Sequence, residues 1–259
     1  MSYDSRDEAE PVLRSLAHLH LDLNFQRPTP CRGNGLVIGR EAAANDSDGA
    51  NAGPGRGGPL TMPPLSINQV QVQPARVPDW SNLEVIHRNT LAPRSHFFLY
   101  DSVQDALAAD VGRARSLLLS GTWGFNLTNG PFNGPTNFYE PTFDNSSWDI
   151  VKVPGMWQCQ GFGKGPQYTN VNYPFPVNPP HVPYDDNECG RYVTKFAVPS
   201  HLQDGDQWRL RFEGVDSAFT VWLNGHKVGY SQGSRNPSEF DVTGVLDVDS
   251  SENYLAVEV

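Results

Sequence analysis

Asn170 is the side chain best suited to bind a ligand, because its short amide offers a hydrogen-bond donor and an acceptor from one position. It lies between Tyr168 and Tyr173 in the run YTNVNYP. A ligand with adjacent hydroxyl groups needs such paired donors and acceptors. The two tyrosines could stack on a ligand, but packing against the body of the protein is their more usual role. On the residues alone, a turn asparagine that closes a loop is the commoner situation.

Other catalytic chemistry has little support in the sequence. The chain contains no GxSxG, HExxH or P-loop motif, and its seven histidines lack metal-ligand spacing. Cys31, Cys159 and Cys189 are too few for a disulfide framework, so reduced thiols are expected, with a Cys159–Cys189 pair as the alternative. Six carboxylates are candidates for acid–base chemistry: Asp185, Asp186, Glu188, Asp216, Glu239 and Asp241.

Composition excludes several classes of partner. The formal net charge of −10 and the lack of a basic stripe argue against nucleic acid and anionic membranes. No apolar run approaches the ~18 residues of a membrane helix. The first residues, MSYDSRDEAEPVL, have neither the basic nor the apolar region of a secretory signal, so a cytoplasmic location is predicted.

Residues 1–76 differ in composition from the rest of the chain. They are rich in Gly, Pro, Ala, Asn and Asp around the run ANDSDGANAGPGRGGP. Such a segment cannot bury enough apolar surface to offset its chain entropy, which predicts a disordered N-terminal extension over 1–76. Within it, the run RSLAHLHLDL could form a short helix.

Residues 77–118 are expected to form a lead-in segment with one short helix. Between residues 102 and 119 the apolar side chains recur at the spacing of an amphipathic helix. The pair Asp101-Ser102 is the expected cap at its start and Gly121 the expected stop signal.

From residue 119 onward the apolar period shortens to two, which indicates β-strands. Turn clusters such as DNSS and PSHLQDGD separate the runs, as in an all-β sandwich. The dipeptide Asn224-Gly225 between two alternating runs predicts a hairpin with a type I′ turn. A further strand, with Leu255 and Val257, is expected to reach Val259. The remaining strands are predicted at 122–127, 148–153, 191–198, 207–213, 218–223, 227–230 and 239–242.

The loop that carries Asn170 interrupts this pattern. Residues 161–190 contain six prolines, which exclude regular secondary structure there. A structureless loop of this length in a compact domain usually has a function or covers a sheet edge.

Five blocks stand in a distinctive order and spacing. They are LSGTWGF at 119–125, VPGMWQCQGF at 153–162, YTNVNYPFPVNPPHVP at 168–183, GRY at 190–192 and the block from Phe212 to Asp241. Together with the lead-in, over about residues 78–259, they resemble the N-terminal sugar-binding domain of the glycoside hydrolase family 2 β-galactosidases, in a fungal-like form.

The resemblance implies a fold and an activity. It implies a jelly-roll β-sandwich over 119–259, galactose-binding-domain-like and incomplete at its C-terminus, because the family's last jelly-roll strand and its (β/α)₈ barrel would follow Val259. The two catalytic glutamates of the family belong to that barrel, so no residue of this chain is expected to be catalytic. The full enzyme would hydrolyse terminal β-galactosides with the barrel in cis or on a separate chain, and it could be a homo-oligomer.

The resemblance also implies roles for two residues. Asn170 would bind the galactosyl group of the substrate. Gln232, in GYSQGSR, matches a glutamine of a magnesium site in bacterial members, although on its own it is as well explained as a loop stabiliser. Mg²⁺ and Na⁺ are expected in the full enzyme and no cofactor for this chain alone. The alternatives are a stand-alone lectin-like galactoside-binding module and a non-functional gene-model fragment.

Overall fold

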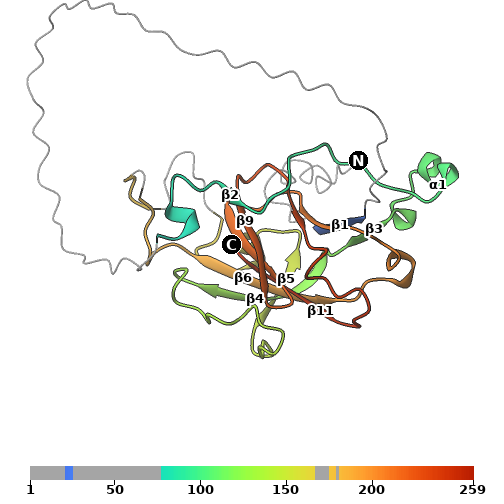
Figure 1. Cartoon of the computed structure of the whole chain (residues 1–259). Helices are drawn as coiled ribbons and strands as arrows, with labels where there is room; N and C mark the ends of the chain where they lie inside the picture. Colours follow the sequence, from blue (N-terminus) through green and yellow to red (C-terminus); the bar gives the residue numbers. More distant parts are fainter. Residues whose placement is uncertain (1–20, 26–76, 167–174, 179–180) are drawn as a thin grey trace, which may run out of the picture. The chain divides into compact units, whose positions relative to one another are not determined.

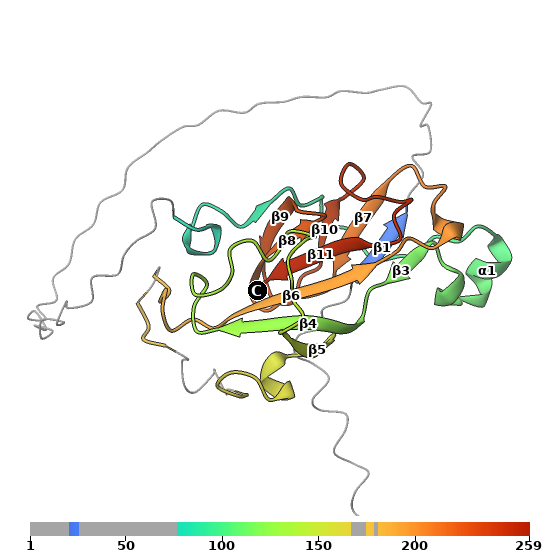
Figure 2. The same ribbon diagram turned by 90° about the horizontal axis from the view of Figure 1, so that it is seen from below.

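A computed structural model describes residues 21–25, 77–166, 175–178 and 181–259. These residues form two antiparallel sheets and little helix (Figures 1 and 2). The smaller sheet runs in the order β10 (Ser238–Asp241), β7 (Trp208–Phe212), β1 (Leu21–Phe25) and β3 (Ser116–Leu118). The larger sheet runs in the order β2 (His87–Arg88), β9 (His226–Gln232), β8 (Ala218–Leu223), β11 (Asn253–Glu258), β6 (Cys189–Phe196), β4 (Gly121–Thr128) and β5 (Asp149–Val153).

Short helices occupy the connections. The α-helix α1 spans Val103–Ala108 and lies beyond the end of β3 in both views. The 3₁₀ helices are η1 (Asp79–Ser81), η2 (Val111–Arg113), η3 (Trp157–Gln160) and η4 (Ser200–Leu202). Within the described ranges, none of the helices has the length and apolar character needed to cross a bilayer.

One apolar core joins the two sheets. Leu210, Phe212 and Phe240 of the smaller sheet belong to the same buried cluster as Val221 and Leu255 of the larger sheet. Along β8 buried residues alternate with partly buried ones, because successive side chains point to opposite faces, whereas nearly every residue of the interior strand β11 is buried. The all-β sandwich predicted from the sequence is therefore confirmed, while its jelly-roll connectivity remains a prediction.

The Asn224-Gly225 hairpin is confirmed. β8 and β9 pair antiparallel around it, and Asn224 and Gly225 take φ angles of 52° and 84°. These positive angles are those of a type I′ turn, which asparagine and glycine tolerate best. The Asn224 amide is held from both sides: its Nδ2 donates to the Val245 carbonyl at 3.0 Å and its Oδ1 accepts from the backbone N–H of Tyr254 at 2.8 Å.

The predicted helix over 102–119 is too long. α1 ends at Ala108, because the next residue, Ala109, takes the left-handed conformation with φ of 51°, and Asp110 then caps η2. The remaining residues extend into β3, because pairing with β1 satisfies their backbone groups. The helix starts where the pair Asp101-Ser102 predicted, and Ser102 is the N-cap, since its hydroxyl accepts the backbone N–H of Asp105 at 3.0 Å.

β1 corrects the expectation of a wholly disordered extension. Residues 21–25 form a strand between β7 and β3, whereas residues 1–20 and 26–76 lie outside the described residues. The run LDLNF alternates apolar and polar residues, which suits a strand, although its first three residues were included in a possible short helix. β11, the strand that reaches Glu258, is an interior strand paired with both β8 and β6.

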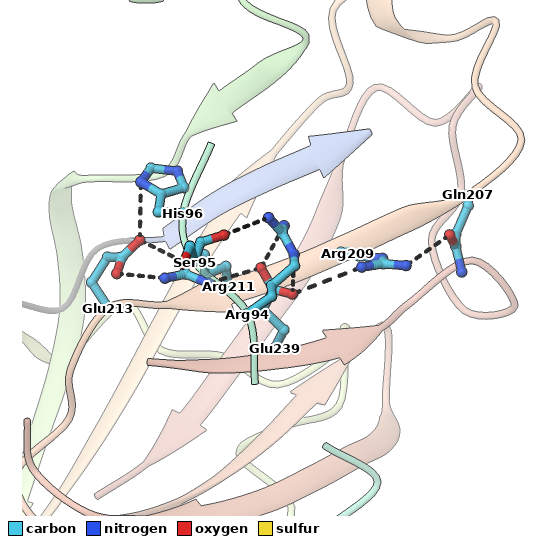
Figure 3. A network of polar contacts seen from close by, with 8 residues as sticks. All are labelled: Arg94, Ser95, His96, Gln207, Arg209, Arg211, Glu213 and Glu239. Carbon is cyan, nitrogen blue, oxygen red and sulfur yellow. Dashed lines mark hydrogen bonds and ion pairs between the residues drawn. The ribbon is translucent and has the colours of Figure 1, made fainter. Parts of the chain in front are cut away.

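The lead-in segment is fastened to the sandwich. β2 pairs with β9, and Thr90 forms a bridge with Phe240. Further along, Arg94 enters a buried ionic network on the outer face of the smaller sheet (Figure 3). Glu239 at its centre lies 2.6 Å from Arg94 and accepts a hydrogen bond from Arg211 at 3.0 Å. The network joins residues that are distant in sequence and fixes the path of the lead-in.

The cysteines match the expectation of reduced thiols. Cys159 is exposed and Cys189 is buried, and both are free, so the alternative disulfide between them is not formed. Burial raises the pKa of the Cys189 thiol to about 12, which keeps it protonated. Cys31 lies outside the described residues.

Candidate functional site

A cavity of about 520 Å³ lies where the lead-in, the loops around η3 and the ends of β8, β9 and β11 meet. Its volume falls in the range of about 300–1,000 Å³ that is typical of small-molecule sites. Gly165 and Phe175, which bracket the segment containing Asn170, both line it. Asn170 itself lies outside the described residues, as do Tyr168 and Tyr173.

Aromatic side chains form part of the cavity wall. Trp157 on η3 is buried, and its ring lies 5.9 Å from that of Phe125 in the core. Trp80 on η1 packs edge-on against Tyr184 at 5.2 Å and lies 6.2 Å from Phe132. Core packing thus holds the Trp157 ring in place, and the lead-in supplies the Trp80 ring.

Two of the cavity's carboxylates interact with one lysine. Lys164 Nζ donates to Asp186 at 2.5 Å, and the backbone N–H of Lys164 donates to Glu188 at 2.9 Å. Asp186 and Glu188 were among the candidates for acid–base chemistry. Here they hold the 164–165 turn against the cavity rim, so a structural role accounts for both.

The other two cavity carboxylates are also paired. Asp216 accepts from the Ser234 hydroxyl at 2.6 Å and lies 3.9 Å from Arg235. Glu258 lies 2.9 Å from Arg191. Burial raises the pKa of Glu258, and the Arg191 charge opposes that rise. The four side-chain carboxylates that the described residues contribute to the lining therefore have structural partners, and the cavity is better suited to binding than to acid–base catalysis.

Two buried polar atoms of the lining lack partners within the described part of the chain. They are Tyr230 Oη and Trp157 Nε1. The side chains of Tyr230 and Trp157 are 1% and 8% exposed. Burial, assisted by the charge of Asp79, raises the pKa of Tyr230 to about 12, so the phenol keeps its proton at neutral pH. Sequence reasoning missed both atoms, because the lack of a partner is a property of the folded chain.

Gln232 lines the same cavity, where the structure gives it a bond to the lead-in. Its Nε2 donates to the Val85 carbonyl at 3.0 Å, which ties β9 to the segment before β2. This contact agrees with the alternative of a loop stabiliser. Among the described residues no cluster of three or more His, Cys, Asp or Glu side chains could hold a metal ion. The magnesium role of Gln232 stays a prediction.

Arg235 and Glu239, four residues apart in the sequence, have different partners in the structure. Glu239 is buried on the outer face of β10 with Arg94 and Arg211, while Arg235 lies near Asp216. Spacing of four residues brings side chains together on a helix but not across a strand and its preceding turn. Sequence reasoning did not find the partners of Glu239, which are 145 and 28 positions away.

Comparison with known proteins decides the family. Residues 116–259 match the family described as glycosyl hydrolases family 2, sugar binding domain. The chain belongs to glycosyl hydrolase family 2. The family 2 match begins at β3 and includes every strand from there to β11, so it covers most of the sandwich and the cavity.

Family 2 relatives are similar to one part of the chain and are much longer than it. A β-galactosidase of Alteromonas mediterranea is 42% identical over 184 residues, which are 70% of this chain and 17% of the relative. A β-galactosidase of Priestia megaterium is 39% identical over 190 residues, 70% of this chain and 18% of the relative. The chain thus spans less than a fifth of the length of these relatives.

Solved structures overlap with the chain less extensively. A β-glucuronidase of Bifidobacterium dentium in complex with coumarin-3-O-glucuronide is 30% identical, with a TM-score of 0.40, over 54% of this chain and 19% of that one. A β-glucuronidase of Bacteroides uniformis is 23% identical, also with a TM-score of 0.40, and the overlap covers 54% of this chain and 14% of that one. Overlaps this small do not bear on activity.

Proposed function

We propose that this chain is the N-terminal carbohydrate-binding portion of a β-galactosidase-like glycoside hydrolase. The observation that carries the proposal is the 42% identity with a curated β-galactosidase over 184 residues, within a family 2 sugar binding domain. In the whole enzyme this portion contacts the galactosyl group, and a (β/α)₈ barrel, in cis or on another chain, supplies the catalytic carboxylates. The enzyme hydrolyses terminal β-galactosides and works as a homo-oligomer.

Asn170 is the proposed substrate contact. Its amide would donate to one galactosyl hydroxyl and accept from the next. The cavity residues on either side of its loop, Gly165 and Phe175, support a position near the ligand. The pairing of the cavity carboxylates supports a binding role for this portion and leaves the bond-breaking chemistry to the barrel.

Mg²⁺ and Na⁺ belong to the proposed whole enzyme, and Gln232 is the residue of this chain proposed to help hold Mg²⁺. The fit can be judged from the Gln232–Val85 contact. Turning the amide by 180° would place its oxygen beside the Val85 carbonyl oxygen, so this corner could offer two oxygen ligands. Mg²⁺ prefers an octahedral set of oxygens that includes carboxylates and water. Gln232 and Val85 therefore fit as contributors, with further ligands drawn from elsewhere in the enzyme.

A chimera tests the proposal. Residues 77–259 would replace the matching segment of the Alteromonas mediterranea β-galactosidase, and hydrolysis of p-nitrophenyl β-D-galactoside would be measured. We expect activity, and Asn170→Ala should lower kcat/KM by about ten- to hundredfold, because a buried hydroxyl partner is left unpaired. Asn129→Ala is the matched control, since Asn129 is exposed and the bond found for it uses its backbone carbonyl.

Two results would count against the proposal. A chimera that folds and assembles as the parent does, yet hydrolyses no galactoside, would overturn it. If Asn170→Ala and Asn129→Ala had equal, small effects, Asn170 would be a loop residue. A stand-alone galactoside-binding module is the second candidate, favoured by the aromatic-lined cavity, and it predicts an inactive chimera alongside galactoside binding by this chain alone.

A further inference from the structure

We propose that β3 and β7 form an acceptor slot for one extended strand, and that β1 of a second copy of this chain fills the slot in place of the chain's own β1. Exchange of β1 would join two copies through their smaller sheets. This association is a property of the sandwich and its N-terminal strand, and it does not depend on the proposed activity.

The slot lies inside the smaller sheet. β1 pairs antiparallel with β7 on one side and with β3 on the other, so it is an interior strand (Figure 2). In the described sheet, β3 and β7 each pair with β1 rather than with each other. Without β1, both strands would present an edge of unpaired backbone N–H and C=O groups. Such edges pair with any chain that offers a matching strand.

The strand and its slot come from different parts of the chain. β3 and β7 lie within residues 116–259, which match the family 2 domain, whereas β1 lies outside that match. Residues 26–76 separate β1 from the next described segment. About 50 residues span up to roughly 170 Å when fully extended, which is several times the diameter of a domain of this size. The connection is therefore long enough for β1 to reach the slot of a second copy.

The register gives the slot a sequence preference. The apolar residues of β1 stand opposite three buried core residues of β7, in the pairs Leu21 with Phe212, Leu23 with Leu210, and Phe25 with Trp208. Asp22 and Asn24 stand opposite Arg211 and Arg209. An acidic residue opposite an arginine is a favourable cross-strand pair. The slot thus fits a strand with apolar residues at alternate positions and acidic or polar residues between them, and each copy of the chain carries one.

Exchange costs little in the strands themselves. A β1 from a second copy would make the same backbone hydrogen bonds and register pairs as the chain's own β1, so two slots filled by exchange are equivalent to two filled within each chain. The tethered strand competes with an effective concentration on the order of 1 mM or less. Exchanged dimers should therefore become more abundant as the protein concentration rises toward that value.

The test places cysteine pairs across β1 and β3 in the full chain, with Cys31→Ser and Cys159→Ser as background. The register sets Asp22 opposite Leu118 and Asn24 opposite Ser116. Opposite positions in an antiparallel pair are about 4.5–5.5 Å apart, within reach of a disulfide, whereas diagonal positions are about 7–8 Å apart. The crossed pairs, 22 with 116 and 24 with 118, are thus matched controls made from the same four substitutions.

Two arrangements separate a fixed strand from an exchanged one. A chain with both Asp22→Cys and Leu118→Cys should form an intramolecular disulfide when oxidised in dilute solution. In a mixture of chains that carry only one of the two cysteines, a disulfide between positions 22 and 118 needs β1 of one copy in the slot of the other. We expect this mixed dimer, resolved by a mass tag on one chain, to form about tenfold faster than with the crossed pair at a protein concentration of about 1 mM.

Three outcomes would overturn the proposal. An intramolecular disulfide no faster than that of the crossed pair would show that β1 does not occupy the slot. An intramolecular disulfide without mixed dimers would refute the second copy as an occupant. Mixed dimers that form equally fast from the crossed pair would reveal contact without the register. If the first pair of substitutions prevents folding, Asn24→Cys with Ser116→Cys provides the same test at the neighbouring register position.

Discussion

Glu239→Gln should destabilise the sandwich strongly, because it removes the central charge of the network in Figure 3. The Glu239 side chain is 4% exposed and lies between Arg94 at 2.6 Å, Arg211 at 3.0 Å and Arg209 at 3.9 Å. Glutamine keeps the shape and one oxygen acceptor, so the change isolates the charge. The substitution leaves Arg211, 3% exposed, with Glu213 as its carboxylate partner among the described residues.

The expected loss follows from these distances. At an effective dielectric constant of about 20, an ion pair at 3.0 Å gains roughly 5.5 kcal/mol before desolvation is counted. Burial costs offset much of this gain, and removing one partner of a buried pair typically costs about 3–5 kcal/mol. Because Arg211 keeps Glu213 as a partner, we expect Glu239→Gln to lower the free energy of unfolding by about 3 kcal/mol. For a domain of this size that is a fall in Tm of about 6–12 °C.

The assay is chemical and thermal unfolding beside a matched control. Glu252→Gln makes the same chemical change in the exposed pair with Lys195, where the side chains are 56% and 47% exposed at 2.7 Å. Glu252→Gln should lower the free energy of unfolding by less than about 1 kcal/mol. Equal losses for Glu239→Gln and Glu252→Gln, or a gain in stability for Glu239→Gln, would refute the view that burial makes this network strong.

Three further results are expected. Gly225→Ala should lower the free energy of unfolding by about 1 kcal/mol, because φ is +84° there. Gly244→Ala should leave the free energy of unfolding unchanged, because no atom lies within 4 Å of the place that its added Cβ would take. Burial raises the pKa of Asp241, but hydrogen bonds from Thr243 and Gln207 outweigh it and hold the pKa below 3.8. Its stabilisation is thus present above pH ~4 and lost as pH falls through the folded pKa, so Asp241→Asn should flatten a pH 5-to-2 stability profile. The chain alone should not hydrolyse p-nitrophenyl β-D-galactoside; turnover abolished by altering one of its carboxylates would contradict this.

Local patterns predicted most of the sandwich. The β8–β9 hairpin was found because Asn224-Gly225 encodes its turn in two adjacent residues. Strands of alternating polarity, such as β4 and β7, were found within one to two residues for the same reason. The boundary of α1 was missed because the apolar spacing continues past Ala109, where the backbone leaves the helix. β1 was missed because its pairing with β3 and β7 lies far away in sequence.

The candidate site was predictable only in part. Gln232, singled out for a magnesium role that stays a prediction, lies in the cavity lining. Tyr230 was not singled out, because the sequence of a strand cannot show which buried hydroxyl lacks a partner. The partners of Glu239 could not be found from the sequence either, since tertiary structure alone brings Arg94 and Arg211 to it.

The substrate preference of the chimera tests the central claim most directly. That claim is that residues 77–259 serve as the carbohydrate-binding portion of an enzyme acting on β-galactosides. The measurement is the ratio of kcat/KM for p-nitrophenyl β-D-galactoside to that for p-nitrophenyl β-D-glucuronide, in the chimera and in its parent enzyme. We predict that both ratios favour the galactoside and agree within about tenfold, or roughly 1.4 kcal/mol. A well-folded chimera that prefers the glucuronide, or that has lost turnover of both substrates, would contradict the account.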